Sequence, residues 1–404
     1  MTVPDELAWL DALRLVLGRA HLWRPEEIAG TVAAAMIRLD ITATIYLVDA
    51  EQRTLRALPR TDADTPPPVP VDASVAGRAF ALVRSIPGGG PAEPARWWVP
   101  MVDGTDRMGI MDFVLPAGLD PHTRALPEHC ELFAGLIGHL ISTCTPRGDS
   151  LHRLRRSQPM SVSSELLWQL LPPLTVSCDD VTISAILEPC YAVGGDGYDY
   201  AVDGRLACLA VLDGVGKGLH GGLATAVALA AIRAARRDGH GLREQARTAD
   251  AALLEQFSDA RFVTGFLAEL NVHTGRLRYV NAGHPAPLLL RDGRSITEVT
   301  GGGRMPLGLD DPAVEIGERT LQPGDRLLLY TDGITEARDA HGEAFGLHRL
   351  AELSDRHAAA GLPAPETLRR LSHAVVEHQQ GPPDDDATML LAEWSPTAAR
   401  RTVP

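Results

Sequence analysis

The chain has 404 residues, enough for two or three domains of ordinary size. It carries 52 acidic against 38 basic side chains, a formal net charge of -14, which argues against nucleic-acid binding and against docking on an anionic membrane. The longest apolar runs are far shorter than the ~18–20 residues that span a bilayer, and the N-terminus lacks a secretory pattern. We therefore expect a globular, cytoplasmic protein that binds neither nucleic acid nor membrane.

Residues 1–145 alternate helical and strand patterns. The spacing of apolar residues predicts helices over 7–21, 28–39 and 131–141 and strands over 42–48, 96–102 and 108–115. This order, with the segment Val71-Asp-Ala-Ser-Val-Ala-Gly-Arg78, resembles a GAF sensor domain. The resemblance implies a small-molecule pocket or a dimer surface; the alternative is a GAF-like scaffold that binds only protein.

Residues 146–173 read as a helical connector or switch segment. Pro159 interrupts it, because proline lacks a backbone donor and clashes inside a helix. Ser161, Ser163 and Ser164 are N-cap candidates for a leucine-bearing helix that Pro172 and Pro173 end.

Residues 174–394 interleave strand runs with pairs of helices. Strands are predicted over 182–187, 206–212, 262–270, 277–281, 326–330 and 388–393, and helices over 219–237, 242–257, 347–354 and 365–378. This order favours a layered α/β sandwich over a parallel doubly wound sheet. Residues 395–404 are expected to form a flexible tail.

Acidic residues recur at the ends of the strand runs. Asp213-Gly214 and Asp332-Gly333 each follow an apolar run, where the glycine is expected to permit a tight turn. Asp196 lies in the glycine-rich segment 194–199, and three acids occupy 384–386, directly before a strand. Clustered carboxylates repel one another unless a cation offsets their charge, and hard divalent ions prefer oxygen ligands, so Mg²⁺ or Mn²⁺ is the expected occupant.

Six segments in one order carry a second resemblance: 193–199, 213–218, 279–285, 306–309, 329–337 and 385–390. They are similar to the motifs of the metal-dependent protein phosphatases (PPM, protein phosphatase 2C-like), in the bacterial SpoIIE/RsbU branch. The resemblance implies an α-β-β-α sandwich with two Mn²⁺ or Mg²⁺ ions between its sheets. The resemblance also implies that the protein hydrolyses phosphoserine or phosphothreonine in a protein substrate.

Carried over by motif, the resemblance implies a set of site residues. Catalytic metal ligands would be Asp196, Asp213, Asp332 and Asp385, with the backbone carbonyl of Gly214. Candidates for supporting the ligands are Lys217, Asp199, Asp386 and His284. Lys217 is the only lysine among the 38 basic residues, which is either chance or a need for a compact ammonium.

The sequence departs from the branch at the site itself. Gly197 stands where an aromatic residue is usual, and is expected to loosen the turn after Asp196. Leu212 and Gly214 stand where the branch commonly has Gly and Val. Val215 stands where eukaryotic relatives have a histidine proton donor, so protonation of the leaving group would fall to water or substrate.

Two other functions compete with a phosphatase. An inert phosphatase-like binding module would explain the departures, although a decayed site usually loses a carboxylate. Gly216-Lys-Gly-Leu-His-Gly221 also matches the phosphate-binding turn of dinucleotide-dependent oxidoreductases, but the basic helical stretch before Asp238 does not fit that fold.

The expected function is therefore a serine/threonine phosphatase controlled by an N-terminal sensor. By resemblance, its substrate is a phosphorylated STAS-domain anti-anti-sigma protein, and it forms a homodimer.

Overall fold

A computed structural model describes residues 6–61, 63–89, 93–119, 121, 125–188, 191–192, 194–216, 218–259, 261–291, 295–381 and 385–404. The chain divides into two compact units, Met1–Gln158 with Arg400–Pro404 and Pro159–Ala399. The division falls inside the expected connector, at the proline that was predicted to interrupt it. Within the described ranges, no helix is both long and apolar enough to cross a membrane.

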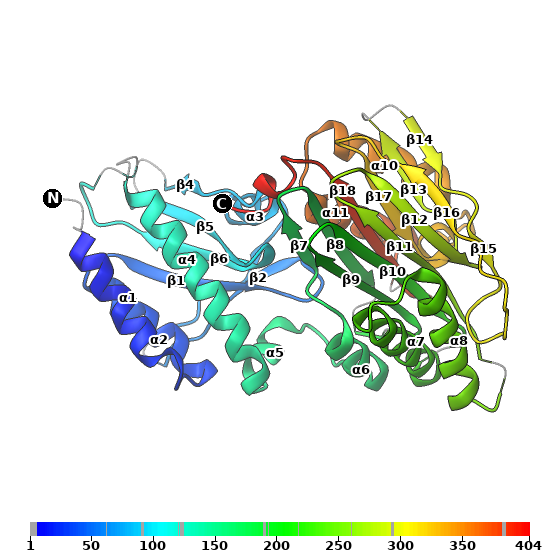
Figure 1. Cartoon of the computed structure of the whole chain (residues 1–404). Coiled ribbons are helices and arrows are strands. Elements are labelled where there is room, and N and C mark those ends of the chain that lie inside the picture. Colours follow the sequence, from blue (N-terminus) through cyan, green and yellow to red (C-terminus); the bar gives the residue numbers. More distant parts are fainter. Residues whose placement is uncertain are drawn as a thin grey trace. The chain divides into compact units, whose positions relative to one another are not determined.

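The first unit is built on one antiparallel sheet of order β3-β2-β1-β6-β5-β4 (Figure 1). Its strands are β1 Thr42–Val48, β2 Thr54–Ala57, β3 Val69–Pro70, β4 Ile86–Gly88, β5 Arg96–Asp103 and β6 Asp106–Val114. Its helices are α1 Glu6–Ala20, α2 Ile28–Ile37, α3 Val75–Leu82, α4 Ala125–Cys144 and α5 Ser150–Arg155.

Side chains of β1 alternate between two cores, as strand geometry requires. Ile45 and Leu47 pack with residues of α1, α2 and α4, whereas Tyr46 and Val48 pack with Phe80 of α3. The sheet is therefore covered by helices on both faces. Whether this unit is a GAF domain stays a prediction.

The second unit contains two sheets. Sheet I has the order β15-β12-β11-β10-β9, with β16 also paired to β12, and sheet II has the order β14-β13-β17-β18-β8-β7. Sheet I comprises β9 Asp196–Asp203, β10 Leu206–Gly214, β11 Val263–Asn271, β12 Arg276–Ala282, β15 Gly303–Arg304 and β16 Gly317–Thr320. Sheet II comprises β7 Thr175–Cys178, β8 Val181–Glu188, β13 Leu288–Arg291, β14 Ser295–Glu298, β17 Arg326–Tyr330 and β18 Ala387–Trp394.

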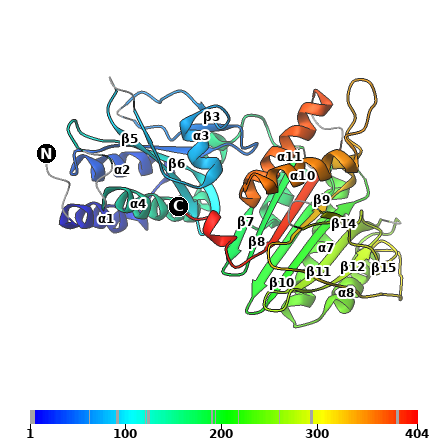
Figure 2. The same ribbon diagram turned by 90° about the horizontal axis from the view of Figure 1, so that it is seen from above.

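Helices cover the outer face of each sheet. They are α6 Val162–Leu170, α7 Leu219–Arg237, α8 Leu242–Gln256, α9 Asp332–Thr335, α10 Gly346–Ala359 and α11 Ala364–Gln379. Figure 2 shows α10 and α11 on one side of the strands and α8 on the other.

Three apolar cores hold these layers together. Tyr198 and Val211 of sheet I pack with Leu390 of sheet II between the sheets. Leu229 lies in the core between sheet I and α7 and α8, and Leu371 in the core between sheet II and the helices α9 to α11. The predicted α-β-β-α sandwich is confirmed.

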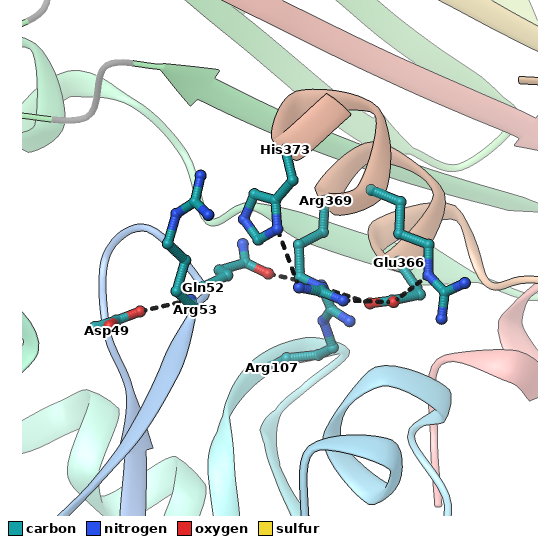
Figure 3. A network of polar contacts seen from close by, with 8 residues as sticks. Asp49, Gln52, Arg53, Arg107, Glu366, Arg369 and His373 are labelled. Atoms are coloured by element: carbon teal, nitrogen blue, oxygen red, sulfur yellow. Dashed lines mark hydrogen bonds and ion pairs between the residues drawn. The ribbon is translucent and has the colours of Figure 1, made fainter. Parts of the chain in front are cut away.

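Polar side chains extend along α11 on the residues that do not enter the apolar core. Arg369 Nε donates to Glu366 Oε2 at 2.8 Å and Arg370 Nε to Glu366 Oε1 at 2.7 Å (Figure 3). Arg369 Nη1 lies 3.2 Å from His373 Nδ1. In the first unit, Arg107 Nη2 donates to Gln52 Oε1 at 2.7 Å.

The predicted elements match the long periodic segments best. Helix α7 and strand β17 have the predicted bounds, and Ser161 caps α6 by accepting from Ser164 N at 3.1 Å. The predictions missed short strands such as β2, β13 and β16, each of which spans only four residues. Residues 399–401, expected in a flexible tail, form a 3-10 helix, and Thr402 is buried.

Candidate metal site

Asp196 and Asp213 face one another on neighbouring strands of sheet I. Asp196 is the first residue of β9, Asp213 is the penultimate residue of β10, and the two are direct antiparallel partners. Both lie in register with Tyr198 and Val211, whose side chains enter the core between the sheets. The two carboxylates are therefore on the inner face of sheet I, at one end. Asp196 was expected in a glycine-rich turn, and it begins a strand instead.

Sheet II contributes acids from two of its strand ends. Asp332 begins α9, two residues after the end of β17, while Asp385 and Asp386 directly precede β18. Because β17 and β18 are antiparallel neighbours, the end of one lies beside the start of the other. This places the three side chains at one edge of sheet II.

Mutual electrostatics show that the acids of the two sheets meet. Burial, and then the charges of Asp332, Asp385 and Asp386, together raise the pKa of Asp213 to about 7. Burial, and then the charges of Asp213 and Asp386, raise the pKa of Asp196 well above its ordinary range. Burial also raises the pKa of Asp332, with Glu336 and Asp385 adding to the effect. Among the described residues, the carboxylates of the two sheets thus act on one another as like charges.

Asp386 holds the backbone that carries Asp196. Its carboxylate accepts hydrogen bonds from the backbone N–H groups of Gly194, Gly195 and Asp196, and it is buried. Burial raises the pKa of Asp386, while these backbone hydrogen bonds oppose the shift. Asp386 was expected to support the ligands; it contacts the backbone of Asp196, and its support of a metal ligand stays a prediction.

Thr331 is a site residue that sequence reasoning missed. Its hydroxyl donates to Asp196 Oδ2 at 2.7 Å, and its Oγ1 accepts from Thr388 N at 2.9 Å. The hydroxyl therefore joins β17 and β18 of sheet II to the head of β9 in sheet I. Thr331 lies within the Tyr330-Thr-Asp-Gly333 motif, which was the only signal available.

Gly214 and Gly333, which follow Asp213 and Asp332, allow close packing rather than tight turns. A Cβ on Gly214 would lie 2.5 Å from Thr225 Oγ1 and 2.8 Å from the Gly221 carbonyl oxygen. A Cβ on Gly333 would lie 1.9 Å from the Asp386 carbonyl oxygen. Neither glycine has a positive φ, so the tight-turn explanation was wrong.

Gly197 does not loosen a turn. It lies inside β9, where a Cβ would come within 2.8 Å of Thr225 Cγ2 and 3.2 Å of Leu229 Cδ1. Both neighbours belong to α7. The missing side chain therefore lets α7 pack directly against the strand that carries Asp196.

The remaining candidate residues have different places. Asp199 lies an odd number of residues from Asp196 and hence on the other face of β9, where it pairs with Arg233 at 2.7 Å and Arg236 at 2.8 Å from α7. Lys217 lies outside the described residues. His284 is buried next to Thr264, the strand partner of Asp213.

The donor chemistry of the cluster fits hard divalent ions. Carboxylates and backbone carbonyls are the oxygen ligands that Mg²⁺ and Mn²⁺ take, and their charge would relieve the repulsion that raises the pKa of Asp196 and Asp213. Among the described residues, no three or more His, Cys, Asp or Glu side chains form a cage that could hold a metal ion. Mg²⁺ does not need such a cage, because it usually keeps several waters and binds one or two carboxylates.

The dinucleotide-binding alternative is wrong. Strand β10 does precede α7, but α7 is followed by α8 and then by β11, which is antiparallel to β10. A dinucleotide turn requires a parallel strand–helix–strand unit. Asp238 is the residue that ends α7 and does not follow a second parallel strand.

Comparison with known proteins finds a matching family and relatives of this chain. Residues 203–395 match the family Stage II sporulation protein E (SpoIIE). Protein IcfG of Synechocystis sp. is 27% identical over 271 residues, 60% of this chain and 42% of that protein. Phosphoserine phosphatase RsbU of Bacillus subtilis is 24% identical over 213 residues, 52% of this chain and 62% of that protein. The chain thus spans less than two thirds of either relative.

A solved structure supports the same assignment. The SiaA-PP2C domain of Pseudomonas aeruginosa is similar with a TM-score of 0.50 and 26% identity, over 58% of this chain and 94% of that domain. The order of elements, the carboxylates at the meeting ends of two sheets and these relatives agree. Residues 203–395 are therefore similar to the SpoIIE family, and the chain is similar to phosphoserine phosphatase RsbU and to the SiaA-PP2C domain.

Proposed function

We propose that the protein is a metal-dependent serine/threonine protein phosphatase. The observation that carries this proposal is the meeting of Asp196 and Asp213 with Asp332, Asp385 and Asp386 at one end of two packed sheets. Asp196, Asp213, Asp332, Asp385 and the Gly214 carbonyl would hold two Mn²⁺ or Mg²⁺ ions. When bound, the ions would activate a water and neutralise charge on the phosphoryl oxygens.

The residues of the chain prepare this site without forming a covalent bond to substrate. Asp386 fixes the backbone of residues 194–196, and Thr331 orients one oxygen of Asp196 through its hydroxyl. Preorganised groups of this kind need no rearrangement as the reaction proceeds. Val215 offers no proton, so water or the substrate would protonate the leaving serine or threonine oxygen.

The substrate class and control are further parts of the proposal. RsbU is named a phosphoserine phosphatase, and family resemblance suggests a phosphorylated STAS-domain anti-anti-sigma protein as substrate. The N-terminal unit would act as a sensor, binding a small molecule or a protein and supporting a homodimer in the cytoplasm.

A metal-dependence assay tests the activity. We expect the full chain to hydrolyse an aryl phosphate only with Mn²⁺ or Mg²⁺, and Asp213→Asn to lower kcat by at least about a hundredfold, because it removes a ligand charge. Asp203→Asn, an exposed substitution at the far end of β9, is the matched control and should keep full activity. Absence of metal-dependent turnover in the wild type would instead support an inert binding module.

A substrate comparison tests the partner. Phosphate release from the phosphoserine of a STAS-domain protein should be faster than from an unrelated phosphopeptide at equal concentration. Equal rates on both would remove the anti-anti-sigma assignment and leave the phosphatase activity standing.

A further inference from the structure

His284 is buried just after β12 and contacts Thr264 of β11, the strand beside β10. It follows β12 in the segment Asn281-Ala-Gly-His284, where Gly283 adopts a φ of +68° that favours glycine. The Asn281 side chain holds the backbone of His284 at both ends, accepting from its N–H at 2.7 Å and donating to its carbonyl at 2.9 Å. His284 is 6% exposed, so burial and the two hydrogen bonds from Asn281 to its backbone restrict the orientation of the ring.

The ring contacts the strand next to Asp213. His284 Nδ1 lies 3.1 Å from Thr264 Oγ1, and Thr264 is the direct partner of Asp213 across β10 and β11. Side chains of antiparallel partners lie on the same face of a sheet, a few ångströms apart. Thr264 therefore lies between the His284 imidazole and Asp213, on the same face of sheet I.

The same ring lies near the strand end of sheet II. The backbone of Tyr330, the last residue of β17, lies near enough to the His284 ring to influence its pKa, and the next residue is Thr331, which donates to Asp196. His284 Nε2 is buried and makes no hydrogen bond within the described part of the chain. The imidazole is thus placed between the neighbour of Asp213 and the segment that leads to Thr331 and Asp332.

Burial keeps this ring neutral. It lowers the pKa of His284 to about 4, against an opposing effect of the Tyr330 backbone. A neutral ring can fill the space between two strand ends without adding a charge beside the metal ligands.

We propose that His284 is a positioning residue: through Thr264 on sheet I and the Tyr330–Asp332 segment of sheet II, it sets the spacing between the carboxylates of the two sheets. This inference rests on the proposed metal site. It assigns to His284 no contact with substrate and no proton transfer.

Three variants of the full chain test the link. His284→Leu keeps most of the volume and loses the polar contact, Thr264→Val removes only the hydroxyl, and His284→Asn keeps an amide where Nδ1 lies. Supporting partners of metal ligands typically contribute 10–100-fold to metal affinity. We expect His284→Leu and Thr264→Val each to raise the Kd for Mn²⁺ at least tenfold by isothermal titration calorimetry, and His284→Asn to restore most of the loss.

The double variant and a control separate this role from general stability. His284→Leu with Thr264→Val should bind Mn²⁺ about as weakly as the worse single variant, because both remove one link. His357→Leu is the matched control, since His357 is a half-buried histidine of the second unit, on α10, whose pKa burial lowers to about 4. It should leave Mn²⁺ affinity unchanged.

The outcomes distinguish this inference from the proposed function. Folded His284→Leu and Thr264→Val proteins with wild-type Mn²⁺ affinity would overturn it, even if the wild type is an active phosphatase. If the wild type binds Mn²⁺ but hydrolyses no phosphoester, a loss of Mn²⁺ affinity in both variants would still support it.

Discussion

At the scale of single residues, hydrogen bonds to carboxylates decide how the site is built. One carboxylate oxygen of Asp196 accepts a hydrogen bond from the Thr331 hydroxyl. The carboxylate of Asp386 accepts hydrogen bonds from three backbone N–H groups. The acids therefore divide into ligand candidates and a structural acceptor. Asp385 and Asp386 are neighbours in the sequence but differ in this way, because Asp385 is exposed and Asp386 is buried.

Thr331→Val should weaken metal binding without unfolding the protein. Valine is close in shape but leaves Asp196 Oδ2 and Thr388 N without a partner, and a buried group left unpaired costs about 1–3 kcal/mol. We expect a Kd for Mn²⁺ raised about tenfold by calorimetry, with Thr331→Ser close to wild type. A Thr331→Ser variant as impaired as Thr331→Val would contradict a role for the hydroxyl.

A buried acid in the first unit predicts a pH dependence of stability. Burial raises the pKa of Asp112 to about 6, although Arg96 Nη1 at 3.2 Å from Oδ2 opposes the shift. The folded state thus binds a proton more tightly than the unfolded state does, so Asp112 contributes stability that is lost as pH rises from about 4 to 6.

Asp112→Asn should reduce this pH dependence. In urea denaturation, the difference in unfolding free energy between the first-unit transitions at pH 4.5 and pH 7 should be smaller in the variant than in the wild type. An unchanged difference would show that Asp112 does not titrate in this range.

At the scale of elements, the contact between α7 and sheet I positions the head of β9. Gly197 and Gly214 let the helix approach the strands, and Asp199 pairs with two arginines of α7. Helix α7 also begins within a few residues of Asp213 along the chain. The packing of one helix is therefore coupled to the placement of two candidate ligands.

Asp199→Asn should lower stability more than metal affinity. Asp199 is 2% exposed, and removing one partner of a buried ion pair costs about 3–5 kcal/mol. We expect a lower denaturation midpoint, with a Kd for Mn²⁺ in the folded protein within about threefold of wild type. A selective loss of Mn²⁺ affinity at unchanged stability would return Asp199 to the list of residues that support the ligands.

At the scale of the whole molecule, the chain combines a unit that contains the acidic cluster with a unit that lacks any assigned chemistry. Each has its own apolar core, on either side of the division at Gln158–Pro159. A unit with its own core can respond to a ligand and alter the activity of its neighbour.

Removal of residues 1–145 tests this regulation. If the first unit is a sensor, the shortened protein should keep Mn²⁺-dependent hydrolysis with a kcat at least about threefold different from the full chain. Its oligomeric state by light scattering should change from dimer to monomer. An unchanged rate and unchanged mass would contradict both control and dimerisation by this unit.

Local pattern was enough to predict the long elements and the acidic residues at strand ends. The apolar periodicity of residues 219–237 and 326–330 predicts α7 and β17 with the bounds seen. Short strands such as β13 and β16 were missed because four residues carry too little periodicity, and their pairing depends on distant strands.

The sequence by itself determined the layered α/β class, the order of motifs and the clustering of carboxylates that favours binding of divalent cations. Only the tertiary structure decided that Asp199 faces α7, that Asp386 binds backbone N–H groups, and that Thr331 and His284 lie between the two sheets. These roles depend on contacts between residues as much as 192 positions apart, which spacing along the chain does not encode.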